Sequence, residues 1–237
     1  MCFDMSALVE ALSPMADGKY RDFNLSLVPD NPLPSLGIRI PLLRAKAKEL
    51  LKGDWRAFLE ASRDYPLFEA RMLHGIVLAG AKCPIGEKLG LIDAFLPHVD
   101  NWAVCDTLCA SFKPRGEALE AAFDFICDCA ASDIEFRKRF GLVMMMNRYG
   151  DDAHAPRVLA AYRAFSHPGY YARMAAAWGL ATLFISQREG VLAILKDDIL
   201  DDFTHNMAIR KLRESYRVSD ADKRLAQALR RSAKRGG

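Results

Sequence analysis

The sequence lacks the features that mark several common classes of protein. The longest apolar run, Phe140 to Met146, is far shorter than the roughly 18–20 residues that a membrane-spanning helix needs. The first residues, Met-Cys-Phe-Asp-Met-Ser-Ala, contain no basic stretch followed by an apolar one, so we expect no signal peptide. These absences predict a soluble protein of the cytoplasm.

Cysteines are few, and their spacing suits neither a metal site nor a disulfide framework. The six cysteines form no CxxC pair, and no histidine lies at zinc-finger spacing. Because 237 residues can bury a sizeable core, we predict reduced and mostly buried thiols. A metal site on Cys105 and Cys109 is the alternative.

A phosphate-binding glycine loop, an HExxH helix and a GxSxG turn are also missing from the sequence. We therefore expect no metal and no cofactor.

Helical periodicity is what the sequence has in abundance. From Pro41 onward the apolar residues recur at helical spacing, and no run shows the period-two alternation of a strand. The first 40 residues are expected to hold a short helix ended by Pro14, a second over 19–28 and a proline-rich loop over 29–37. Further helices are predicted over 54–63, 66–81, 84–97, 100–112, 115–131, 133–149, 154–164, 168–187, 190–196 and 203–216, with a last one starting at Ser219.

These helices come in pairs. The pairs begin near residues 54, 84, 115 and 153, a spacing of about 30–40 residues that is typical of HEAT-like two-helix repeats. We therefore predict an all-α fold, an α-α superhelix or solenoid with a concave face. Residues 1–237 would form a single HEAT-like repeat domain, with 1–40 as an N-terminal helical cap. A compact helical bundle without repeats is the alternative.

Charge is distributed unevenly along the chain. Residues 204–237 contain ten Lys or Arg and three Asp or Glu, a net charge of +7, whereas the whole chain has +3. Such a basic end indicates an anionic partner, of which nucleic acid is the commonest. A solvated basic tail is the alternative.

A tryptophan and an aspartate stand together near the middle of the chain. Trp102 and Asp106 are four residues apart, so they share one face of a helix that Asp100 is expected to cap. They fall at the edge of an inward apolar arc, where a core meets a solvent groove. The arc consists of Val104, Cys105, Leu108, Cys109 and Phe112. The alternatives are core packing for the tryptophan and a capping or surface role for the aspartate.

Another tryptophan, Trp178, lies on the predicted helix 168–187. It forms one stripe with Tyr171 and Met174, and the alanines around it allow close approach of neighbouring helices. Core packing is again the alternative.

Arginines and a lysine form a further group of candidates. Arg210, Arg213 and Arg217 lie at i, i+3 and i+7, along one stripe of the helix 203–216 and its exit, and Lys211 is next to them. The planar guanidinium group donates two hydrogen bonds at once, which suits phosphate. Ion pairing with carboxylates of a neighbouring repeat is the alternative.

Two more arginines, Arg137 and Arg139, start a helix whose continuation is apolar almost all round. A helix buried to that extent can expose side chains only near its ends. We therefore expect both arginines to point into a groove.

Four segments, in this order, resemble the bacterial DNA alkylation-repair glycosylases of the AlkD-like family, which are HEAT-like helical solenoids. They are Asp100-Asn101-Trp102-Ala103-Val104-Cys105-Asp106, Arg137-Lys138-Arg139-Phe140, the stretch from Tyr170-Tyr171 to Trp178, and Thr204-His205-Asn206-Met207-Ala208-Ile209-Arg210-Lys211. The segment Leu36 to Arg44 is similar to the family's N-terminal Gly-Val-Arg-x-Pro motif. Phe203 stands where the family often has tryptophan, which fits a divergent branch.

The resemblance implies a function. Such an enzyme hydrolyses the N-glycosidic bond of N3- or N7-alkylated purines in duplex DNA without flipping the base. Trp102 and Trp178 would flank the deoxyribose of the damaged nucleotide, Asp106 would stabilise positive charge on the sugar and orient a water, and Arg139 would contact the DNA backbone. These residue types suit the chemistry, because an anion and aromatic faces both stabilise a cationic transition state.

Double-stranded DNA with alkylated bases is therefore the expected partner, and the protein is expected to be a monomer that binds no membrane and no metal. Two other functions fit the same residues. One is a non-catalytic DNA-binding protein of the same family, for bent or branched DNA. The other is a HEAT-type scaffold for protein interactions.

Overall fold

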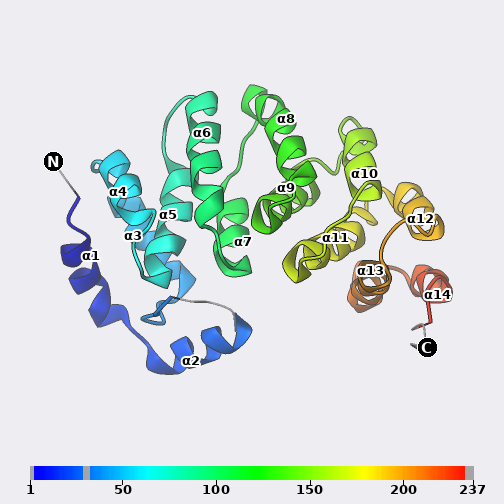
Figure 1. Cartoon of the computed structure of the whole chain (residues 1–237), viewed down its shortest axis with the longest axis horizontal. Helices are drawn as coiled ribbons and strands as arrows, with labels where there is room; N and C mark the ends of the chain where they lie inside the picture. The colour runs from blue at the N-terminus through cyan, green and yellow to red at the C-terminus, as the bar shows by residue number, and fades with distance from the viewer. Residues whose placement is uncertain (1–2, 29–32, 233–237) are drawn as a thin grey trace. The chain divides into compact units, whose positions relative to one another are not determined.

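A computed structural model describes residues 3–28 and 33–232. Within these ranges the chain forms fourteen α-helices, two short 3₁₀ helices and no β-strand (Figure 1). The predicted all-α fold is confirmed. Residues 33–39 are non-helical, as expected for the end of the proline-rich loop, whereas 29–32 lie outside the described residues. No helix in the described ranges is long and apolar enough to cross a membrane.

The bounds of the helices differ from the predicted ones by a few residues. The α-helices are α1 (Met5–Leu12), α2 (Gly18–Leu27), α3 (Ile40–Leu50), α4 (Trp55–Ser62), α5 (Phe68–Gly80), α6 (Ile85–Phe95), α7 (Trp102–Ser111), α8 (Glu117–Ala131), α9 (Glu135–Arg148), α10 (Ala155–Arg163), α11 (Tyr170–Leu183), α12 (Arg188–Lys196), α13 (Asp202–Glu214) and α14 (Asp220–Ala228). The 3₁₀ helices are η1 (Ser13–Met15) and η2 (Leu96–His98).

Contacts group the chain into two compact units, Met1–Ala122 and Phe123–Gly237, and the boundary falls inside α8. Each unit is described by itself. The single repeat domain expected for residues 1–237 therefore stays a prediction.

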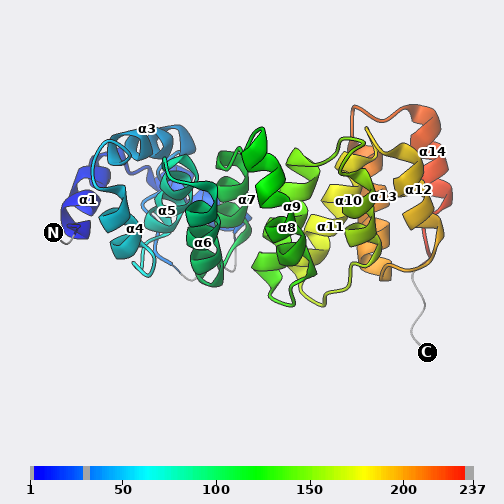
Figure 2. The same ribbon diagram turned by 90° about the horizontal axis from the view of Figure 1, so that it is seen from above.

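In the first unit the helices lie in two layers. Helices α3, α5 and α7 pack side by side in one layer, and α4 and α6 pack on α5 from the other (Figure 1). The second unit repeats this scheme, with α9, α11 and α13 in one layer and α10 and α12 in the other, while α14 packs on α13 (Figure 2). This stacking of helix pairs is the solenoid-like arrangement that their rhythm predicted.

Side chains that accept hydrogen bonds fix where several helices begin. The Asp54 and Asp201 carboxylates accept from the N–H groups of Ala57 (3.1 Å) and Thr204 (3.0 Å), so both cap a helix. At α7 the prediction that Asp100 is the cap is wrong. Asn101 Oδ1 accepts from the Val104 N–H at 3.0 Å, and the Asp100 carboxylate accepts from the Asn101 amide at 2.8 Å. Asp100 thus orients the capping residue.

A buried carboxylate anchors the segment that precedes α3. The Glu69 side chain of α5 accepts hydrogen bonds from the Ser35 hydroxyl at 2.8 Å and from the backbone N–H groups of 36–38 at 2.9–3.3 Å. Gly37 has a φ of +78°, and a Cβ atom there would lie 2.3 Å from the Asp17 carbonyl oxygen. Only glycine fits this position, so the segment before α3 packs closely against the start of α2.

The described cysteines form no disulfide, and the reduced state of the thiols stays a prediction. Cys105, Cys109 and Cys129 are buried and Cys83 and Cys127 are half-buried, while Cys2 lies outside the described residues. Across the described part of the chain, no three His, Cys, Asp or Glu side chains could jointly hold a metal ion.

Candidate functional site

Helix α7 places Trp102 and Asp106 at the edge of the core of the first unit. Its apolar arc is buried as predicted, and Val104, Cys105 and Leu108 are each at most 1% exposed. Trp102 and Asp106 both remain partly exposed. Neither is fully buried, so both lie at the edge of the core, and core packing stays an alternative for Trp102.

A hydrogen bond fixes the orientation of the Trp102 ring. Its indole Nε1–H donates to the carbonyl oxygen of Leu27 at 2.9 Å. Leu27 is the last residue of α2, where the helix carbonyl groups have no partner further along the helix. The sequence could not show this contact, because the two residues are 75 positions apart and nothing local links them.

In the second unit, α11 presents Trp178 outside the core. The neighbouring Ala177 and Gly179 are buried, whereas the Trp178 side chain is 38% exposed. Tyr171 and Met174 are half-buried, so the predicted stripe of Tyr171, Met174 and Trp178 is the uncovered edge of α11. Core packing is therefore wrong for Trp178.

Close packing between α10 and α11 fixes the rotation of α11 about its axis. A Cβ atom at Gly179 would lie 1.9 Å from the Tyr162 hydroxyl oxygen, so α10 and α11 touch where glycine allows it. That buried hydroxyl donates a hydrogen bond to the Leu142 carbonyl oxygen at 2.8 Å, and burial raises the pKa of Tyr162 well above its usual value. The inward face of α11 is thereby fixed, and Trp178 must face outward.

Two side chains of α9 hold the start of α11. The Glu135 carboxylate accepts from the N–H groups of Tyr171 (2.6 Å) and Ala172 (3.2 Å), so it caps α11 from a neighbouring helix. The guanidinium group of Arg139 donates to the Tyr171 carbonyl oxygen at 2.9 Å. Arg139 is 6% exposed, so the expectation that it points into an open groove is wrong. Sequence reasoning missed Glu135 altogether.

Arg137 is less buried than Arg139, and it rests on α8. Its guanidinium carbon lies 5.6 Å from the centre of the Phe125 ring. A cation over an aromatic face is favourable, and this contact directs the Arg137 side chain toward α8.

A pocket of about 330 Å³ lies beside Trp178. It brings the tryptophan together with two of the predicted DNA-binding residues, Lys211 and Arg217. Its lining residues are Trp178, Ala181, Thr182, Ile185, Lys211, Glu214, Ser215 and Arg217. Arg217 lies past the end of α13 at Glu214, so the predicted stripe of three arginines is interrupted there.

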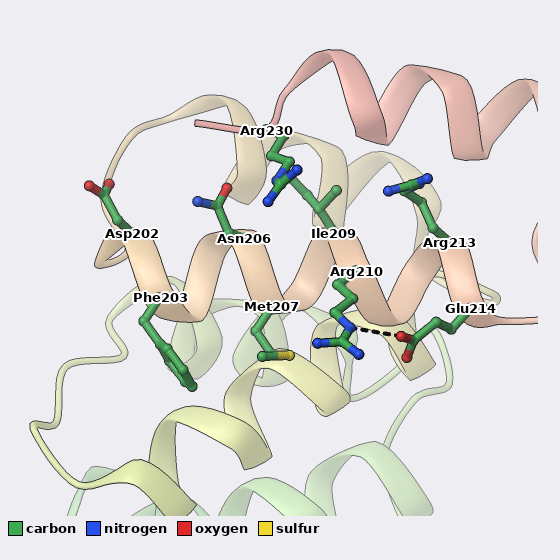
Figure 3. Close-up of a pocket in the computed structure, with 9 residues that line it drawn as sticks. All are labelled: Asp202, Phe203, Asn206, Met207, Ile209, Arg210, Arg213, Glu214 and Arg230. Atoms are coloured by element: carbon green, nitrogen blue, oxygen red, sulfur yellow. Dashed lines mark hydrogen bonds and ion pairs between the residues drawn. The ribbon is translucent and has the colours of Figure 1, made fainter. Parts of the chain in front are cut away.

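The other two arginines of that stripe line a larger pocket, of about 720 Å³, along α13 (Figure 3). Arg210 donates to the Glu214 carboxylate at 2.8 Å. This arginine therefore forms an ion pair, but its partner is on the same helix and not on a neighbouring repeat. Figure 3 shows the Arg213 side chain directed toward α14 and the Arg210 side chain directed away from it. In the described ranges Arg213 and Arg217 form no ion pair.

Fold and site together define an all-α protein of stacked helix pairs that carries partly exposed tryptophans and several exposed arginines. The sequence profile of the DNA alkylation repair enzyme family matches residues 9–218. The chain belongs to this family, as its resemblance predicted, and it acts in the repair of alkylated DNA, with DNA as its substrate. A comparison with curated proteins finds none that matches this chain.

Proposed function

We propose that this repair enzyme is a DNA glycosylase that hydrolyses the N-glycosidic bond of N3- or N7-alkylated purines in duplex DNA. The observation that carries the proposal is the position of Trp102, Asp106 and Trp178. All three are at least partly exposed on packed helices, Trp178 at 38%, so they are accessible to a DNA ligand.

The chemistry needs an anion more than an acid. An alkylated purine already carries a positive charge, so it leaves with the electron pair of the glycosidic bond and becomes neutral. The sugar then gains oxocarbenium character, and water adds to C1′ while its proton passes to a carboxylate or to solvent. In this proposal the ionised Asp106 carboxylate stabilises that charge and orients the water.

The two tryptophans supply aromatic faces, which attract the cationic sugar and base. The bond from Trp102 to Leu27 holds one ring in place before DNA binds, which avoids ordering it during the reaction. Lys211 and Arg217 line the pocket beside Trp178, and in this proposal they bind phosphates near the lesion. Because Trp178 is a surface residue, the lesion can be bound without extrusion of the base into an enclosed pocket.

Arg139 takes a positioning role here, because it holds the backbone of α11, which carries Trp178. The contact of Arg139 with the DNA backbone, which the family resemblance implies, stays a prediction. The same holds for Arg137, Arg210 and Arg213 as DNA-binding residues.

The test is the release of 7-methylguanine and 3-methyladenine from alkylated duplex DNA. We expect release by the wild-type protein, a loss of about 100-fold or more in Asp106→Asn, and no loss in Asp128→Asn, an exposed carboxylate of α8. Equal, near-zero release by wild type and Asp106→Asn would refute a glycosylase.

A second candidate is a family member that binds DNA without cleaving it. The basic pocket along α13 favours it, because DNA binding needs the arginines and gives Asp106 no role. Binding that weakens steeply with salt, without any base release, would select this function.

A further inference from the structure

The larger pocket along α13 is lined by basic side chains where α13 meets the end of α14. Figure 3 shows the side chains of Asn206 and Arg213 directed toward Arg230 and α14, and those of Met207 and Arg210 directed away from α14. The pocket also contains two carboxylates, but each is engaged elsewhere. Asp202 pairs with Arg231 at 3.1 Å, and Glu214 pairs with Arg210.

Two cations of this pocket are therefore uncompensated. Within the described parts of the chain, neither Arg213 nor Arg230 forms an ion pair, and both are exposed. Arg213 also lines a neighbouring hollow, which adds Lys223 and Arg224 and a single carboxylate, Asp220. The cations thus form a row that extends along α14.

Hydrogen bonds from α13 fix the backbone around Arg230. The His205 ring donates from Nε2 to the Leu229 carbonyl oxygen at 2.8 Å, and the Asn206 amide exchanges two hydrogen bonds, of 3.0 and 3.1 Å, with the backbone of Arg231. The guanidinium group of Arg231 also donates to the Leu200 carbonyl oxygen at 2.6 Å. These contacts clamp residues 229–231 across the start of α13.

His205 is 1% exposed, and burial lowers its pKa, so the ring stays neutral and keeps Nε2 as a donor. His205 and Asn206 belong to the segment that resembles the DNA-repair family, yet neither has a role in the proposed reaction. Their bonds to the clamped segment explain why these residue types stand there.

A pair of guanidinium groups and an amide around one hollow suit an anion with several oxygen atoms. A single inorganic phosphate ion would contact only the side chains that line this pocket. The row of Lys223 and Arg224 beyond it fits a linear polyanion whose charges repeat, which is the chemistry of a DNA backbone.

We propose that the hollow between α13 and α14 binds a backbone phosphate of duplex DNA through Arg213 and Arg230, and that His205 and Asn206 are the positioning residues that hold Arg230 there. The proposal shares with the proposed function only the use of DNA as partner. It requires no base release, so the two can fail separately.

The first experiment measures the affinity of the full chain for an undamaged duplex at several salt concentrations. We expect Arg213→Gln/Arg230→Gln to weaken binding roughly tenfold at low salt and to lower the slope of log K against log salt by about 1. Arg157→Gln/Arg163→Gln is the matched control, because it also removes two charges, from α10, where Arg157 is paired with Asp124 and Arg163 with Asp197. A slope that the double variant shares with this control would overturn the proposal.

Inorganic phosphate distinguishes a free-anion site from a DNA site. We expect it to compete with the duplex for wild type and to lose this effect in the double variant. Phosphate binding that depends on Arg213 and Arg230 without any change in DNA affinity would contradict the assignment to DNA.

A third measurement tests the positioning role. His205→Phe removes the donor, whereas His205→Gln keeps one. We expect His205→Phe to weaken DNA binding as Arg230→Gln does, with no further loss when the two are combined, and His205→Gln to retain binding. If the effects of His205→Phe and Arg230→Gln add in full, the positioning role of His205 is wrong. Weak DNA binding by a His205→Gln protein that unfolds at the wild-type temperature would also contradict this role.

Discussion

The contact between Gly179 and Tyr162 gives the sharpest prediction about stability. A Cβ atom at position 179 would lie 1.9 Å from the hydroxyl oxygen of Tyr162 and 2.4–2.5 Å from two of its ring carbons. Carbon atoms normally pack at about 3.5–4.0 Å. In Gly179→Ala the tyrosine ring must therefore move by more than an ångström, although it is fully buried.

Two costs follow from that movement. Overpacking a well-packed core typically costs about 1–3 kcal/mol. If the ring moves, the 2.8 Å hydrogen bond from Tyr162 to the Leu142 carbonyl oxygen also breaks, which leaves a buried group unpaired at about 1–3 kcal/mol. The two costs sum to about 2–6 kcal/mol, from which the better helix propensity of alanine subtracts about 0.5–1 kcal/mol. We therefore expect Gly179→Ala to lower the free energy of unfolding by about 1–5 kcal/mol, measured by urea denaturation.

Gly90 provides the matched control. It also lies inside a helix, α6, but no atom lies within 4 Å of the Cβ position there. Gly90→Ala should therefore stabilise the protein by about 0.5–1 kcal/mol, since alanine is the better helix former. A Gly179→Ala protein within about 0.5 kcal/mol of wild type would refute the packing argument.

Three other predictions concern buried polar groups. Glu69→Gln removes the charge from the hydrogen bonds to residues 35–38 and should lower the free energy of unfolding of the first unit by about 2–3 kcal/mol, measured in urea. Glu69→Ala should lower it further, and equal stability of wild type and both variants would contradict this. Burial, followed by the charge of Arg63, lowers the pKa of His74 to about 3, so the unfolded chain binds a proton below pH 6.5 that the folded chain cannot bind. Stability should fall by about 2 kcal/mol between pH 6.5 and 5, and His74→Gln should flatten this part of the profile of unfolding free energy against pH. Trp102→Phe, which loses the bond to Leu27, should cost about 1 kcal/mol and slow base release, and an unchanged release rate would count against a role for the oriented ring.

Much of the fold was predictable because it depends on local chemistry. Apolar residues at helical spacing, prolines and capping aspartates defined most of the helices and their rhythm. The error at α7 has a physical cause, since Asp100 and Asn101 are both good caps and only the structure shows that the amide faces Val104.

The candidate site was less predictable, because its supports are contacts between distant segments. The position of Trp102 at the edge of the apolar arc followed from a helical wheel, but its bond to Leu27 did not. Helical spacing also says nothing about which guanidinium groups turn inward, so Arg139 was misplaced. Arg230 was not singled out because a chain that turns back across α13 leaves no local signal.

Single-turnover release of 7-methylguanine from alkylated duplex DNA, with DNA affinity measured on the same proteins, is the most direct test of the proposed glycosylase. We expect wild type to release the base, and Asp106→Asn to bind the DNA as tightly but to release the base at least about 100-fold more slowly. An Asp106→Asn protein that releases the base at the wild-type rate, or a wild-type protein that binds alkylated DNA and releases nothing, would contradict it.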